Sequence, residues 1–120
     1  MSGINRQLIL DSRSRLINKH LPDTPQVERL LRQEGKAYVF NDQQTMNRVI
    51  QAIIERGQRT NIEDETDNYE RYGLYFTKAV GYILKKDGSQ LPLYYAEIQI
   101  IKVTNTYHVI PRTKPRKTNQ

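Results

Sequence analysis

The chain has 120 residues, and their composition bounds what the protein can be. Lys and Arg together number 19 against 13 Asp and Glu, which gives a formal net charge of +6. A chain of this length forms one domain, and an excess of positive charge attracts polyanions, of which nucleic acid is the commonest. A soluble basic protein without a nucleic-acid role is the alternative. Because cysteine is absent, disulfides, thiolate catalysis and a cysteine-ligated zinc are excluded.

The chain shows no targeting or membrane segment. Its first ten residues, MSGINRQLIL, hold no apolar run long enough for a signal peptide, and no stretch reaches transmembrane length. We therefore expect a soluble chain that is cytoplasmic, or that a carrier delivers into a target cell. Residues 1–18 are expected to form an N-terminal helix or arm, residues 19–113 a single α+β catalytic-type domain, and residues 114–120 a disordered basic tail.

The first half of the chain predicts two helices with a short strand between them. Thr24 as N-cap and Pro25 at the first helical position mark where the first helix begins. Residues 37–40 are β-prone and of the kind that fills the middle of a sheet. Asn41 or Asp42 then caps the second helix. Its apolar face repeats at i, i+3, i+4, i+7 and i+8, on Met46, Val49, Ile50, Ile53 and Ile54.

The second half is β-prone from residue 71 onward. Residues 86–89, KDGS, are a hairpin signal, and residues 91–103 are expected to form one longer strand after it. Along that strand one face is apolar core and the other is half polar, so that it could line a groove. The sequence thus predicts an α+β fold, with two or three N-terminal helices packed on an antiparallel meander sheet of about four strands.

An acidic run lies between the two halves. Its carboxylates, Glu63, Asp64, Glu65 and Asp67, are of the type that binds a divalent cation. The glycine and the ligand spacing of a calcium loop are missing. A solvated loop is therefore the preferred interpretation, and we expect neither a metal nor another cofactor.

The two histidines are the natural candidates for chemistry. Metal-free RNA cleavage needs a base for the ribose 2′-hydroxyl, an acid for the leaving oxygen and a cation for the phosphorane charge. Histidine suits the first two roles near neutral pH. His20 precedes the first predicted helix and His108 lies on the last strand, so only the fold can bring them together. A surface or capping histidine is the ordinary alternative for each.

The last strand offers two possible faces. Alternate side chains share a face, so His108 and Arg112 point one way, and Tyr107 and Thr113 the other. The first face would give an acid or base with a phosphate clamp, and the second a pair of hydroxyls. Because Pro111 can break the alternation, both remain open.

Other residues are candidates for substrate binding. Tyr72 and Tyr107 belong to a set of eight tyrosines and could stack bases, although a core ring with its hydroxyl at the rim is the commoner role. Arg71 is a candidate phosphate ligand, with a solvated charge as the alternative.

Several segments resemble a known family. Residues 19–24, KHLPDT, with the helix that follows, then residues 37–57 and the closing YHVI, resemble in order and spacing the ribonuclease A-like toxin domains at the ends of bacterial contact-dependent inhibition proteins. The stretches YERYGLYF, GYILKKDGSQLPLYYAEI and YHVIPRTKP are similar to a cyanobacterial domain of unknown function found in polymorphic-toxin settings. The resemblance spans roughly residues 16–115.

The resemblance implies a catalytic histidine at His20 and an arginine in the following helix, for which Arg29 and Arg32 compete. The family's last strand ends in a Thr-x-Tyr pair, where this chain has Pro111 and Thr113. His108 and Arg112 would then have to take over, or the domain has lost activity.

These observations together predict a metal-independent RNA endonuclease of bacterial toxin type. RNA, including tRNA, and an acidic immunity protein are the expected partners, with no membrane. A non-catalytic nucleic-acid-binding module and a protein-interaction domain are the alternatives. The expected catalytic residues are His20, His108, Arg112 and Thr113, and the expected substrate-binding residues are Arg29, Arg32, Arg71, Tyr72 and Tyr107.

Overall fold

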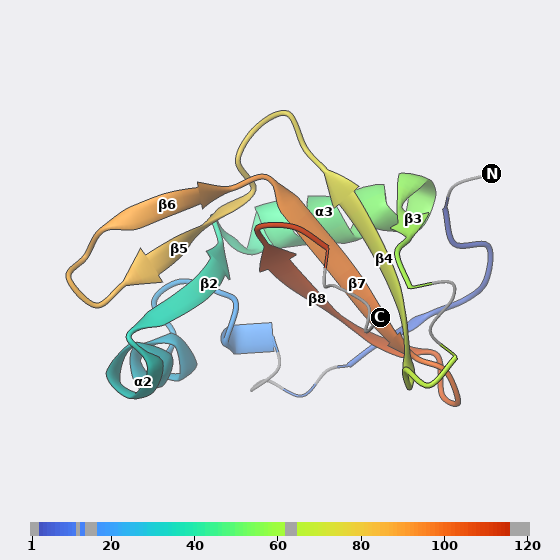
Figure 1. The fold of residues 1–120 in the computed structure, drawn as a ribbon, viewed down its shortest axis with the longest axis horizontal. Coiled ribbons are helices and arrows are strands. Elements are labelled where there is room, and N and C mark those ends of the chain that lie inside the picture. Colours follow the sequence, from blue (N-terminus) through green and yellow to red (C-terminus); the bar gives the residue numbers. More distant parts are fainter. Residues whose placement is uncertain (1–2, 12, 14–16, 62–64, 116–120) are drawn as a thin grey trace.

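The computed structural model describes residues 3–11, 13, 17–61 and 65–115, and this part of the chain contains two helices and eight strands (Figure 1). The helices are α2 (Pro25–Glu34) and α3 (Gln43–Arg56). The strands are β1 (Ile9–Leu10), β2 (Lys36–Phe40), β3 (Gln58–Arg59), β4 (Tyr69–Tyr75), β5 (Gly81–Lys85), β6 (Gln90–Leu93), β7 (Tyr95–Ile101) and β8 (Thr106–Arg112). Of the tail expected at 114–120, residues 116–120 lie outside the described residues.

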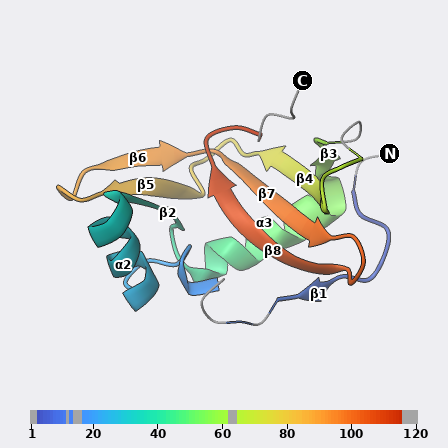
Figure 2. The same cartoon turned by 60° about the horizontal axis from the view of Figure 1, so that its bottom comes forward.

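The strands form two sheets. One has five strands in the order β1-β8-β7-β4-β3, and the other has three in the order β2-β5-β6. In the larger sheet β7 pairs antiparallel with both β4 and β8, while β1 joins β8 in parallel. Helix α3 runs along one face of this sheet, and α2 lies beside β2 at the other end of the molecule (Figures 1 and 2).

The predicted arrangement of helices on a four-stranded meander is wrong. The chain is mixed α+β, but both helices lie mid-chain among the strands, and there are two sheets instead of one. The main cause is the stretch 91–103, which divides at Tyr94 into strands of different sheets. Alternating polarity predicts a strand but not its partner, and β1 and β3, of two residues each, are too short to give any pattern. Strand β2, expected in mid-sheet, lies at a sheet edge.

The structure confirms the predicted residues that cap the two helices and the predicted hairpin. The Thr24 hydroxyl caps α2 by accepting from the Val27 N–H, and Pro25 is in its first turn. Asp42, not Asn41, caps α3 and accepts from the Thr45 N–H at 2.7 Å. The hairpin at residues 86–89 joins β5 to β6.

The main core lies between α3 and the larger sheet. Ala96, Ile98 and Ile100 of β7 are fully buried there against the apolar stripe of α3, as their alternation predicts. A second cluster joins α2 to β2 through Val27, Ala37 and Val39, and thereby fixes the helix on the smaller sheet. No helix among the described residues is long and apolar enough to cross a membrane.

Candidate active site

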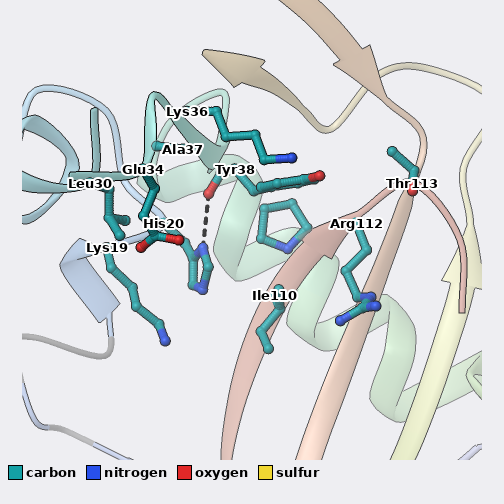
Figure 3. Close-up of a pocket in the computed structure, with 11 residues that line it drawn as sticks. Lys19, His20, Leu30, Glu34, Lys36, Ala37, Tyr38, Ile110, Arg112 and Thr113 are labelled. Carbon is teal, nitrogen blue, oxygen red and sulfur yellow. Dashed lines mark hydrogen bonds between the residues drawn. The ribbon is translucent and has the colours of Figure 1, made fainter. Parts of the chain in front are cut away.

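His20 lies in the turn ahead of α2 and is bound to β2 by two hydrogen bonds. The Phe40 N–H donates to the His20 carbonyl at 2.9 Å, and the His20 ring bonds through Nδ1 to the Tyr38 carbonyl at 2.8 Å (Figure 3). A carbonyl oxygen only accepts, so Nδ1 carries the proton and Nε2 holds the lone pair. Nε2 is buried and has no hydrogen-bond partner among the described residues.

Burial also decides the charge of this ring. His20 is only 8% exposed, and burial, the largest cause, lowers its pKa to about 4. The positive charge of Lys19, and that of His108 where it is protonated, also lower the pKa of His20, while the hydrogen bond to the Tyr38 carbonyl raises it. At neutral pH His20 is therefore an uncharged base whose lone pair lies on Nε2.

A cavity of about 460 Å³ opens beside His20, between β2 and the end of β8. It joins segments that are far apart in the sequence: the Lys19-His20 pair and the end of the last strand, Arg112 with Thr113 (Figure 3). The lining residues are Lys19, His20, Leu30, Glu34, Lys36, Ala37, Tyr38, Ile110, Pro111, Arg112 and Thr113. Three of the four expected catalytic residues, His20, Arg112 and Thr113, thus line one cavity.

The structure resolves which face of β8 is available. Tyr107, Val109 and Pro111 are buried, whereas His108 and Arg112 are on the alternate, half-exposed face. Pro111 does not break the alternation, because it pairs with β7 on one side and lies past the two residues of β8 that pair with β1. Thr113 follows the strand and reaches the cavity as well.

His108 does not line this cavity. Its ring packs edge-on against Tyr69, with the ring centroids 6.1 Å apart. Burial, with Lys19 next in importance, lowers the pKa of His108, so at neutral pH this ring is uncharged. An uncharged histidine is poorly suited to donate a proton. The two histidines are close enough for their charges to interact, but they do not share the cavity.

The structure does not bring the expected substrate-binding residues to the cavity. Arg29 and Arg32 are exposed on α2, which instead presents Leu30 and Glu34 to it. Tyr107 is 7% exposed in the main core. Tyr72 packs against that core from β4, with the Arg59 guanidinium 5.9 Å from its ring centroid.

Arg71 is buried instead of solvated. It is 2% exposed, and its guanidinium bonds Asp67 at 2.8 Å and the fully buried Glu97 at 3.3 Å. The Arg71 guanidinium, which was expected to bind phosphate, is therefore already paired with two carboxylates. Of the acidic run, Glu63 and Asp64 lie outside the described residues, and no group of side chains arranged for a metal occurs within them.

Four polar residues of the cavity, Lys19, Glu34, Lys36 and Tyr38, are not among the predicted site residues. Lys36 and Tyr38 come from β2, with the Lys36 ammonium 5.7 Å from the centroid of the Tyr38 ring, and Glu34 ends α2. The alternation of Lys36 and Tyr38 with the buried Ala37 was a usable signal. The prediction of a mid-sheet strand over residues 37–40 conceals this signal, because both faces of such a strand would be covered.

The fold and this cavity define a mixed α+β domain of two sheets with a histidine-containing pocket where they meet. The chain belongs to a family described as a domain of unknown function (DUF6972), whose model matches residues 6–116. No curated protein matches the chain, and no solved structure does.

Proposed function

We propose that this chain is a metal-independent RNA endonuclease of bacterial toxin type. One observation carries the proposal. An uncharged, buried histidine, whose Nε2 has no partner in the described part of the chain, lines the same cavity as three cationic side chains, Lys19, Lys36 and Arg112. A base beside cations is what attack by a ribose 2′-hydroxyl requires. The resemblance of the Lys19-His20 segment to the toxin domains supports the same reaction.

In the proposed mechanism RNA binding in the cavity gives the substrate access to Nε2 of His20, which is buried in the free protein, and Nε2 removes the proton of the 2′-hydroxyl. The freed oxygen attacks phosphorus, the bond to the 5′-oxygen breaks, and a 2′,3′-cyclic phosphate forms. The Tyr38 carbonyl holds the ring with its lone pair on Nε2, much as a second group orients the base in other acid–base sites. The substrate's negative phosphodiester raises the pKa of His20 toward its ordinary value and so strengthens the base.

The other cavity residues supply charge and a proton. The Arg112 guanidinium stabilises the phosphorane, because its planar donors match phosphate oxygens, and the Thr113 hydroxyl orients the phosphate. Lys19 takes the proton-donating role first expected of His108, since Lys19 lines the cavity and His108 does not. The acidic immunity protein implied by the resemblance remains part of the proposal, and the net charge of +6 is compatible with it.

The deciding experiment is incubation of the purified protein with total RNA in EDTA. We expect discrete fragments ending in 2′,3′-cyclic phosphate from the wild type and none from His20→Ala. His108→Ala is the matched control: it removes the other imidazole, which does not line the cavity, and cleavage should persist. Intact RNA with folded wild-type protein would overturn the enzyme proposal and favour a non-catalytic binding module.

The role of Arg112 gives a graded prediction. Arg112→Ala removes the phosphorane clamp and should lower kcat/KM about 10²-fold or more, as loss of one donor does in other sites of this kind. Arg112→Lys keeps the charge but not the planar fork, so it should recover only part of the loss. Single-turnover cleavage of a short RNA measures both, and equal rates for all three proteins would remove Arg112 from the mechanism.

The pKa of His20 sets the acid limb of the cleavage profile. Because kcat/KM reports ionisation of the free enzyme, activity should remain nearly constant as pH falls from 7 to 5 and decline near pH 4. Initial rates at RNA concentrations well below KM, with circular dichroism to show that the protein is folded at each pH, test this. A decline centred near 6.5 would instead identify an ordinary, exposed histidine as the base.

A further inference from the structure

A second cavity, of about 560 Å³, lies beside α3 where the connection between β4 and β5 passes the helix. The helix contributes one stripe of side chains to its wall, because residues three, four and seven apart share a face. The lining residues are Asn41, Thr45, Arg48, Val49, Ala52, Arg56, Phe76, Thr77, Lys78, Ala79 and Val80. None of them belongs to the cavity beside His20.

The charge of this cavity is of one sign. Arg48, Arg56 and Lys78 line it and are exposed, and none of its lining residues carries a carboxylate. Two carboxylates lie near its cations but outside its lining. Asp42 accepts the Thr45 N–H as the α3 cap, and Glu55 forms an exposed ion pair with Arg56 at 3.9 Å. Three cations around one hollow favour a bound anion.

The shape and the remaining walls favour a nucleic-acid strand over an acidic protein surface. The hollow has the volume of a small-molecule site, and Phe76 adds a half-buried aromatic ring to the cations. Cations with aromatic rings are the combination that binds single-stranded nucleic acid. A protein partner would need a far larger surface, roughly 800 Å² on each side.

Strand β2 connects this cavity with the one beside His20. Lys36 and Tyr38 of β2 line the first cavity, and Asn41, just past its end, lines the second. Three residues of extended chain span about 10 Å. We propose that the cavity on α3 is a second binding site for the phosphate backbone of a single-stranded nucleic acid, which holds the strand away from the bond that is cut. This inference rests on the proposed function for the identity of the strand, RNA, and for the bond that is cut.

Ala52 provides the sharpest test, since its small side chain lies between Arg48 and Arg56 on the cavity stripe. Ala52→Glu places a negative charge in the hollow, whereas Ala52→Gln adds nearly the same volume without charge, and both residues are good helix formers. Gln90→Glu makes the same charge change on exposed β6, away from both cavities. The probe is a fluorescent 2′-O-methyl RNA oligonucleotide, which cannot be cleaved through a 2′-hydroxyl.

We expect Ala52→Glu to weaken binding about tenfold relative to Ala52→Gln at low salt, and to lower the slope of log K against log salt by about 0.7 for each phosphate that the variant no longer neutralises. Gln90→Glu should bind like the wild type. Equal affinities and slopes for Ala52→Glu and Ala52→Gln would overturn the site, as would a wild type that does not bind the probe. The site would also be reassigned to an acidic protein if the wild type bound polyglutamate and not the probe, and if Ala52→Glu abolished the binding of polyglutamate.

The outcome is separate from that of the cleavage experiment. Cleavage of RNA with no effect of Ala52→Glu on probe binding would leave the nuclease and remove the second site. Binding that depends on residue 52, without cleavage of RNA, would leave the second site and remove the nuclease.

Discussion

Replacing Glu97 with alanine is expected to lower the free energy of unfolding by roughly 3–5 kcal/mol. Glu97 is fully buried, and its Oε2 accepts from both the Arg71 guanidinium at 3.3 Å and the Gln99 amide at 3.0 Å. Without it, Asp67 is the one carboxylate of the described residues still paired with the Arg71 charge, which is itself 2% exposed. A buried charge that loses a partner destabilises the fold because it has already given up its hydration.

Urea unfolding followed by circular dichroism measures this loss. Glu55→Ala is the control, because Glu55 and Arg56 form an exposed pair at 3.9 Å whose removal should leave the midpoint nearly unchanged. The double variant Arg71→Met with Glu97→Leu removes both charges at similar volume and should recover much of the stability. If Glu97→Ala costs no more than Glu55→Ala, the buried ion pair is not what stabilises this face of the sheet.

The second large effect is a loss of stability as the pH falls from 7 to 5. The pKa of His20 is about 4 in the folded protein and near 6.5 in the unfolded chain. Above pH 6.5 the ring is uncharged in both states, so its protonation does not oppose folding. Below pH 6.5 the ring is protonated in the unfolded chain but not in the folded protein. The free energy of unfolding therefore falls by about 2 kcal/mol at pH 5, and by more as the pH approaches 4. The lowered pKa of His108 acts in the same direction.

A comparison of wild type with His20→Gln isolates this contribution. The amide of the variant does not titrate, so the midpoint of urea unfolding should fall less between pH 7 and pH 5 in the variant than in the wild type. The variant is expected to be less stable at pH 7, since the bond to the Tyr38 carbonyl changes, but the test concerns the difference between the two pH values. An equal fall in both proteins would show that His20 is not buried in the uncharged form.

Elements whose signals are local could be predicted from the amino-acid sequence. The alternation of β7 identifies only one of its two buried faces, because Tyr95, Glu97 and Gln99, on the face expected to line a groove, are buried as well. Thr24, Asp42 and the hairpin at 86–89 act through hydrogen bonds a few residues away, and the apolar period of α3 fixes which side of that helix is core. These features need no knowledge of the rest of the chain, and the structure has them where the pattern predicts.

The pairing of strands and the composition of the site depend instead on tertiary structure. Residues 91–103 belong to two sheets because Leu93 pairs with β5 and Tyr95 pairs with β4. Arg71 can be buried because Asp67 and Glu97 neutralise its charge. Arg112 and His20 line the same cavity because β2 lies against β8. Such contacts depend on which distant surfaces exclude water together, and no periodicity along a single segment carries that information.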